Sequence, residues 1–153
     1  MEKTQNPGIG LKSVHLVQCN IGQLKYDVEL KFELGIKEFG RKVSEDGKVL
    51  QILVDFDLMY KVENPPCRFD CAFIAIYTRP DNAPMKWEEF KDHIAVAHMV
   101  PFVREFISNM TNRMPLQVLM IPPMNTSKML ADFRASKTLP ATQPGAALNT
   151  AGS

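Results

Sequence analysis

The chain has 153 residues with 18 basic and 17 acidic side chains, which gives a formal net charge of +1. This length supports one domain that needs no disulfide or metal to fold, and the mixed charges offer no basic stripe for nucleic acid. Residues 1–6 lack the apolar centre of a signal peptide, and no apolar run approaches the ~18 residues that span a bilayer. The odd number of cysteines, three, indicates free thiols. We therefore expect a cytoplasmic protein that does not insert into membranes.

Two strands are predicted in the first third of the chain, after a flexible segment over residues 1–10. Residues 11–22 carry β-branched and apolar side chains with a weak alternation, which favours a strand. From Tyr26 to Ile36 every second residue is apolar, and most residues between them are charged. This period of two predicts a strand with one buried and one solvated face. It excludes a helix, because the charges would then surround the whole helix.

Two more strands are predicted in the middle of the chain. Residues 44–48 contain an Asp-Gly pair, which is typical of a tight turn. Alternation then returns over residues 50–62 and is stopped by two prolines. Residues 67–78 are apolar on both faces, as expected of a strand that is covered or lies in an interface. Together the strands predict a four-stranded antiparallel meander.

The next segment is predicted to be a long helix. Apolar residues recur at three and four positions from Trp87 to Met110, which predicts an amphipathic helix. Pro101 lies inside it and should kink it, at a cost of about 3 kcal/mol that packing must offset. Strands followed by helices predict an α+β fold, with the helices on one face of an antiparallel sheet.

A shorter helix is predicted near the end of the chain. Residues 116–121 should form an extended or coil segment that ends at two prolines. The second helix then runs to Arg134, and three polar residues could cap it: Asn125, Thr126 or Ser127. From residue 137 onward the composition has no periodicity, so residues 137–153 are expected to be disordered. The folded domain is expected to span residues 11–136.

No arrangement of residues points to catalysis. Three pairs of chemically active residues stand close together in sequence: Cys67 and Cys71, His93 and His98, and Asp55 and Asp57. The cysteines lack the second pair that a zinc site needs, and the histidines fall on different faces of a helix. The aspartates could form a carboxylate dyad, but a solvated sheet face explains them more simply. We therefore expect neither a reaction nor a cofactor or metal.

The long helix carries an unusual motif. A proline is followed by an aromatic residue, an Arg-Glu pair and an aliphatic residue: Pro101, Phe102, Arg104, Glu105 and Ile107. Downstream come a Pro-Leu pair at 115–116, an Ile-Pro pair at 121–122, and then Leu130 and Phe133. These features resemble the main helix, the Pro-leucine segment and the closing helix of SecB, the protein-export chaperone. The resemblance spans about residues 11–133 and implies four antiparallel strands with two helices.

The resemblance also implies a function and an assembly. A SecB-like protein would hold unfolded or precursor polypeptides in apolar grooves without ATP, as a homotetramer built from two dimers. Its partners would be these clients and either the motor SecA or an antitoxin. Candidate client-binding residues are Phe102, Phe106, Met110, Phe56, Tyr60 and Leu119. Candidate oligomer-interface residues are Ile74, Ile76, His98 and Pro101.

Two alternatives stay open beside a general export chaperone. SecB-like proteins also serve as dedicated chaperones of antitoxins in toxin–antitoxin systems. A small-ligand-binding α+β domain is a more distant alternative, and the lack of convergent polar groups argues against it. Six of the nine methionines lie from Met99 to Met129. Methionine adapts to varied apolar partners, so this run suits a groove for unfolded chains, although ordinary core packing would also explain it.

Overall fold

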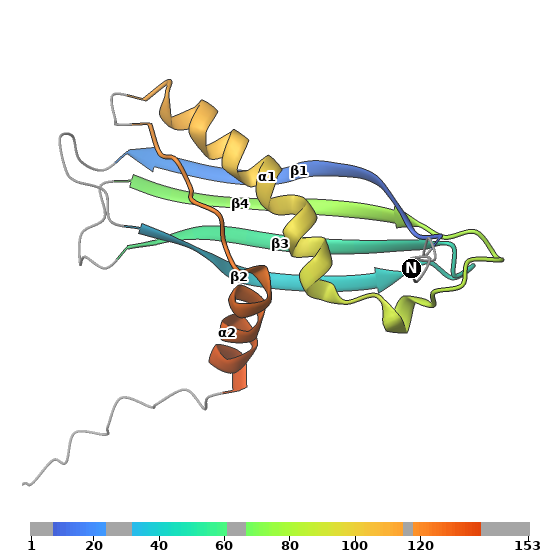
Figure 1. Ribbon diagram of the computed structural model, residues 1–153. Helices are drawn as coiled ribbons and strands as arrows, with labels where there is room; N and C mark the ends of the chain where they lie inside the picture. The colour runs from blue at the N-terminus through green and yellow to red at the C-terminus, as the bar shows by residue number, and fades with distance from the viewer. Residues whose placement is uncertain (1–7, 24–31, 61–66, 115–117, 139–153) are drawn as a thin grey trace, which may run out of the picture.

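The computed structural model describes residues 8–23, 32–60, 67–114 and 118–138. Within these residues four antiparallel strands form one sheet, and two α-helices lie on one of its faces (Figure 1). The strands are β1 (Gly10–Gln23), β2 (Phe32–Val43), β3 (Val49–Tyr60) and β4 (Cys67–Thr78). The helices are a short 3-10 helix η1 (Trp87–Glu89), α1 (Asp92–Thr111) and α2 (Thr126–Thr138). The predicted α+β class with an antiparallel sheet is confirmed.

The order of the strands across the sheet is β1-β4-β3-β2. Strands β2, β3 and β4 form the predicted meander, but β1 joins the far side of β4 and pairs with it from Gly10 opposite Thr78 to Gln23 opposite Cys67. The expectation of a meander of all four strands is therefore corrected for β1. The alternation of apolar residues specifies which face of a strand is buried, but not which neighbour it pairs with.

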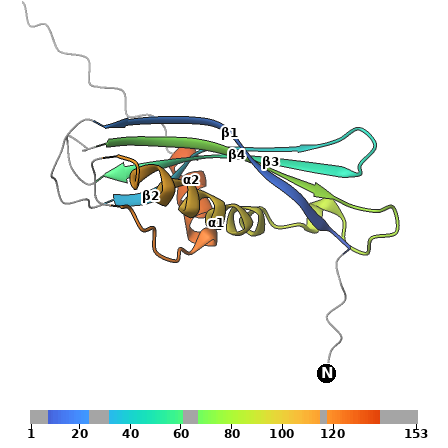
Figure 2. The same cartoon turned by 90° about the horizontal axis from the view of Figure 1, so that it is seen from above.

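The two faces of the sheet differ sharply in their side chains. The helix face carries the core residues of β3 and β4: Leu50, Ile52, Val54, Phe56, Leu58, Phe69, Cys71, Phe73, Ala75 and Tyr77. The opposite face, which we call the open face, carries Leu53, Asp55, Asp57, Asp70, Ile74 and Ile76. Figure 2 shows both helices on the same side of the sheet. The core therefore lies between the helix face and α1.

The turn between β2 and β3 forms as predicted. Gly47 has a φ of +70°, a conformation that glycine adopts without a steric cost, and its N–H donates to the Ser44 carbonyl at 2.9 Å. The indole N–H of Trp87 donates to the Gly47 carbonyl at 2.7 Å. This hydrogen bond ties the turn to η1.

The long helix begins later than the sequence predicts. Trp87 belongs to η1, Phe90 has an extended backbone with ψ of 114°, and α1 starts at Asp92. Both aromatic side chains are nevertheless buried, and the Phe90 ring centroid lies 4.8 Å from that of Tyr77. Trp87 and Phe90 are thus apolar because both are buried in an irregular segment, and their spacing of three residues resembles that of a helix.

Helix α1 runs unbroken through Pro101. Proline cannot donate to the carbonyl four residues earlier, which here belongs to Ala97. Both Ala97 and Pro101 are exposed, so water can solvate the carbonyl that the helix leaves free. This placement on the outer side of α1 lowers the cost of the proline.

The end of the described chain forms α2. Of the three residues predicted to cap this helix, Asn125 does so: its side-chain oxygen accepts a hydrogen bond from the Lys128 N–H at 2.9 Å. The helix includes Lys137 and Thr138, so the predicted tail starts two positions too early. Residues 139–153 lie outside the described part, as do residues 1–7 of the segment 1–10 that was predicted to be flexible.

Thr111 joins the end of α1 to the segment that follows. Its hydroxyl is fully buried, donates to the Ile107 carbonyl at 2.8 Å and accepts the Leu119 N–H at 3.0 Å. Leu119 and Ile121 are thereby held against the core, and the segment then leads into α2.

We expect Thr111→Val to lower the free energy of unfolding by about 1–2 kcal/mol, because the Leu119 N–H would be left buried and unpaired. The midpoint of urea unfolding measures this change. Thr138→Val is the matched control, since Thr138 is exposed and its replacement should cost less than about 0.5 kcal/mol. Equal midpoints for the two variants would show that Thr111 is not an anchor.

Candidate functional site

A groove of about 470 Å³ lies between β2 and α2. Its apolar lining comes from three segments: Leu34, Gly35 and Ile36 of β2, Pro122, Pro123 and Met124 of the connecting segment, and Met129 and Phe133 of α2. Polar side chains complete the lining: Glu33, Asn125, Lys128, Asp132 and Ser136. An apolar interior with a few polar groups is typical of sites that bind apolar side chains.

The sequence explains why this groove stays open. Pro122 and Pro123 have no N–H groups and a fixed φ, so the segment that contains them cannot pair with β2 as a fifth strand. Asn125 then starts α2, and Met129 and Phe133, four positions apart, share one face of this helix. Two flexible methionines, Met124 and Met129, thereby face the edge of β2.

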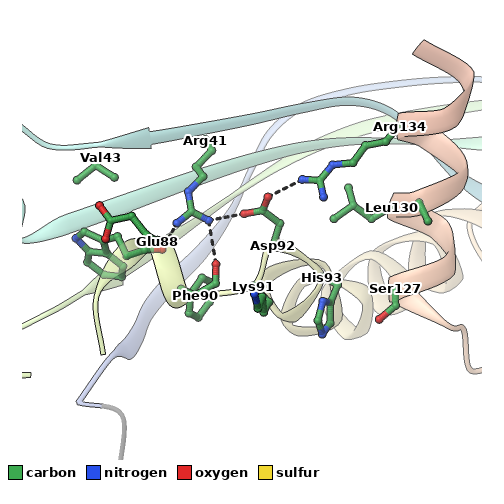
Figure 3. Close-up of a pocket in the computed structure, with 12 residues that line it drawn as sticks. Arg41, Val43, Glu88, Phe90, Lys91, Asp92, His93, Ser127, Leu130 and Arg134 are labelled. Carbon is green, nitrogen blue, oxygen red and sulfur yellow. Dashed lines mark hydrogen bonds and ion pairs between the residues drawn. The ribbon is translucent and has the colours of Figure 1, made fainter. Parts of the chain in front are cut away.

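A network of charged side chains holds α2 in place (Figure 3). The Asp92 carboxylate accepts from Arg41 of β2 and, at 2.6 Å, from Arg134 of α2. Arg41 also donates to the backbone carbonyls of Trp87 and, at 3.2 Å, of Phe90. The Asp92 side chain is only 18% exposed, so its ion pair with Arg41 is weakly screened. Three separate elements meet at this carboxylate.

Two further contacts support α2. The guanidinium of Arg134 lies 5.7 Å from the ring centroid of Phe39, and Lys137 pairs with Glu38 at 3.1 Å. Leu130 is buried beneath the helix. Leu130, the half-buried Met129 and these charged contacts together hold α2, the helix that walls the groove.

A polar pocket of about 560 Å³ adjoins this network. Its lining includes Arg41, Asp92 and Arg134, which are paired with one another (Figure 3). Because these three side chains already hydrogen-bond to one another, few of their donors and acceptors are available to bind a ligand. We therefore assign the candidate site to the groove between β2 and α2 and read the polar pocket as part of its support.

The client-binding residues predicted from sequence are dispersed in the structure. Phe102 is 44% exposed on α1, and Phe106 packs edge-on against Phe69 and Phe73 with centroids 5.8 and 6.1 Å away. Met110 is half-buried against the core. None of these three lines the groove between β2 and α2.

Two other predicted client-binding residues are buried. Phe56 is fully buried and Leu119 is 3% exposed, so both are core residues and are closed to a client in this structure. Their apolar character reflects packing under the helices. The side chain of Tyr60 lies outside the described residues.

The predicted interface residues lie on opposite sides of the sheet. Ile74 and Ile76 are half-buried on the open face, whereas His98 and Pro101 are exposed on α1. The Nδ1 atom of His98 lies 2.9 Å from the hydroxyl oxygen of Tyr77, so its ring also contributes to packing within the chain. A single flat contact cannot use all four residues, and an assembly that uses them needs two distinct interfaces.

The open face holds a cluster of carboxylates beside one lysine. Partial burial, followed by a hydrogen bond with Asp70 and its negative charge, raises the pKa of Asp55 to about 6. Burial also raises the pKa of Asp57. Lys37 pairs with Asp70 at 2.7 Å, and one buried oxygen of Asp55 has no hydrogen-bond partner among the described residues. The predicted solvated pair of aspartates is therefore partly desolvated.

Asp55 should make the stability of the fold depend on pH. Its raised pKa favours the folded state at low pH, and this contribution is lost as the pH rises from about 4 through about 6. We expect Asp55→Asn to be more stable than wild type by about 1–2 kcal/mol at pH 7.5, a figure reduced for solvent screening, and equal to it near pH 4. Urea unfolding at both pH values measures the difference. Asp81→Asn, at an exposed position, should show no such difference, and a wild-type-like pH profile for Asp55→Asn would contradict the assignment.

The described residues contain no group of three or more histidine, cysteine or acidic side chains that could hold a metal ion. Neither α1 nor α2 is long and apolar enough to cross a bilayer.

Comparisons with known proteins give a fold but no sequence family. No family model matches the sequence, and no curated protein matches it. A SecB-like chaperone of Mycobacterium tuberculosis, solved with a ChAD peptide from the HigA1 antitoxin, superposes with a TM-score of 0.62 at 15% identity. The match covers 76% of this chain and 90% of that one. A protein of unknown function from Streptococcus agalactiae gives a TM-score of 0.43 at 13% identity, over 76% of this chain and 97% of that one. The match to the Mycobacterium tuberculosis chaperone shows that the chain has a SecB-like fold.

Proposed function

We propose that this protein is an ATP-independent holdase chaperone, which binds unfolded or precursor polypeptides in the groove between β2 and α2 and catalyses no reaction. The observation that carries the proposal is the apolar, methionine-containing lining of this groove in a SecB-like fold. Methionine side chains adapt to different apolar partners, which a chaperone with many clients requires.

The energetics suit a protein that binds and later releases its client. Burying four client side chains at about 2 kcal/mol each contributes roughly 8 kcal/mol. Ordering the client costs about 2–5 kcal/mol, so binding at one groove is weak. A homotetramer, which we propose as the assembly, would present several grooves and raise the affinity by about 10²–10⁴ without new kinds of contact.

A second candidate is a chaperone dedicated to one antitoxin. The solved SecB-like chaperone of Mycobacterium tuberculosis holds an antitoxin peptide, and its fold covers most of this chain. The resemblance to SecB implies that a role in export would instead require docking to SecA through carboxylates of the sheet. On the open face Lys37 neutralises part of the charge of Asp55, Asp57 and Asp70, which favours the antitoxin candidate over SecA docking.

Refolding of an unrelated, slow-folding protein tests the holdase function. Stoichiometric amounts of the chain, added without ATP when the client is diluted from denaturant, should delay refolding or suppress aggregation. Different extended clients should also compete with one another for binding to the chain. If a folded sample has no effect in molar excess, general chaperoning is excluded.

The same assay separates the candidates. A strong preference for one short protein over generic unfolded chains would identify a dedicated antitoxin chaperone. Saturable binding of one compact molecule, with no effect on refolding, would identify a small-ligand domain.

A further inference from the structure

Two cysteines lie directly opposite each other in the sheet. Cys19 of β1 pairs in register with Cys71 of β4, and both are free thiols. Directly opposed residues of antiparallel strands point to the same side, which for Cys71 is the helix face. Cys19 is exposed and Cys71 is 1% exposed, so one thiol of the pair faces solvent and the other lies at the edge of the core.

The spacing of such a pair suits a disulfide. Opposed Cα atoms of antiparallel strands lie about 4.5–5.5 Å apart, within the roughly 4.4–6.8 Å that disulfides span. Their Cβ atoms lie about 4.5–5.5 Å apart and must approach by about 1 Å. Strand β1 is at the edge of the sheet and has a register shift between Leu16 and Gln18, so it can make this small movement.

The environments of the two thiols differ in a way that sets their roles. Burial, followed by the charges of Asp55 and Asp70 and also of Cys19, raises the pKa of Cys71 to about 12. Cys71 therefore stays protonated and does not react with oxidants directly. The exposed Cys19 is the thiol that an oxidant in solution can reach, and the register of β1 and β4 places it directly opposite Cys71.

We propose that Cys19 and Cys71 form a reversible intramolecular disulfide when a hydroperoxide oxidises the protein. The Cys19 thiolate attacks the peroxide O–O bond, which breaks, and Cys19 becomes a sulfenic acid while an alcohol or water leaves. The Cys71 thiol then passes its proton to the sulfenic oxygen of Cys19 as its sulfur attacks the Cys19 sulfur, the S–O bond breaks, and water leaves. Two thiols are oxidised and one peroxide is reduced. A dithiol reductant reverses the bond by exchange.

The disulfide would fasten the edge strand to its neighbour. It closes a loop of roughly 50 residues, whose restriction in the unfolded state should raise the Tm by about 10 °C. Oxidation would thereby strengthen the fold of a protein that remains able to bind clients, because the groove between β2 and α2 lies at the opposite edge of the sheet.

The test treats the full-length native protein with stoichiometric hydrogen peroxide and then blocks the remaining thiols by alkylation under denaturing conditions. We expect the oxidised protein to carry one alkyl group where the untreated protein carries three, a peptide map to join Cys19 to Cys71, and dithiothreitol to restore both thiols. Cys67→Ser should behave as wild type. Cys19→Ser, a change at an exposed position, should form no bond and show no rise in Tm.

Three results would overturn the proposal. One is a sulfinic acid at Cys19 together with a Cys71 thiol that the reagent alkylates. Another is a disulfide bond between Cys19 and Cys67. The third is a bond between the Cys19 residues of two chains, seen as a dimer on a non-reducing gel. The test compares wild type with Cys19→Ser, so it does not require a folded variant with a substitution at the buried Cys71.

Discussion

Replacing Met129 with lysine should abolish the delay of client refolding while the protein remains folded. Met129 lines the groove between β2 and α2 and is half-buried, so its replacement places an ammonium group where a client side chain would bind. The variant loses about 2 kcal/mol of apolar contact and must also desolvate a charge, so client affinity should fall at least about tenfold. The refolding assay measures this loss at a matched concentration of folded protein.

Met120→Lys is the matched control for this experiment. Met120 is 71% exposed and lies outside the groove, so the same substitution there should leave the delay of refolding unchanged. If the two variants behave alike, either both active or both inactive, the client does not bind between β2 and α2. In that case Phe102 and Phe106 on α1 become the next positions to substitute.

Replacing Asp92 with alanine should have the largest effect on stability. It removes the carboxylate that Arg41 and Arg134 share, and it leaves the partly buried Arg41 guanidinium without its anion. We expect the free energy of unfolding to fall by about 2–3 kcal/mol, less than for a fully buried pair because solvent screens the Arg134 side. Urea unfolding measures this fall, and hydrogen exchange of the α2 amides should become faster than that of the β3 amides.

Asp132→Ala serves as the control for the change at Asp92. Asp132 pairs with Lys128 on α2, but both side chains are more than 60% exposed, so the loss should be at most about 0.5 kcal/mol. A similar cost for the two variants would mean that the network around Asp92 does not anchor α2. Client binding should weaken in Asp92→Ala, because α2 forms a wall of the groove; Asp132 itself lines that groove, so its variant is a control for stability alone.

The elements with local signals were predictable from the sequence. The alternation of β3, the Asp-Gly turn and the limits of β4 each depend on neighbouring residues, and the structure confirms them. The weak alternation of β1 also has a physical reason. Register shifts between Leu11 and Ser13, and between Leu16 and Gln18, interrupt its period of two.

The groove and its support had no comparable local signal. Arg41, Asp92 and Arg134 are separated by 51 and 42 positions, so no spacing motif links them before the chain folds. Large apolar residues drew attention to Phe56 and Leu119, although such residues more often fill the core than line a site. The methionine run contained a usable signal, because Met124 and Met129 do line the groove.

The position of β1 also has a consequence for how the chain is made. Gly10 pairs with Thr78, 68 positions later, so a ribosome completes β1 long before its partner β4 exists. Pairings between such distant segments form slowly, and the meander of β2, β3 and β4 can close without β1. In a nascent chain without β4, Val14 and Ile21 of β1, which pack against the core of the folded protein, are therefore uncovered, and a translational pause before β4 would lengthen their exposure to aggregation.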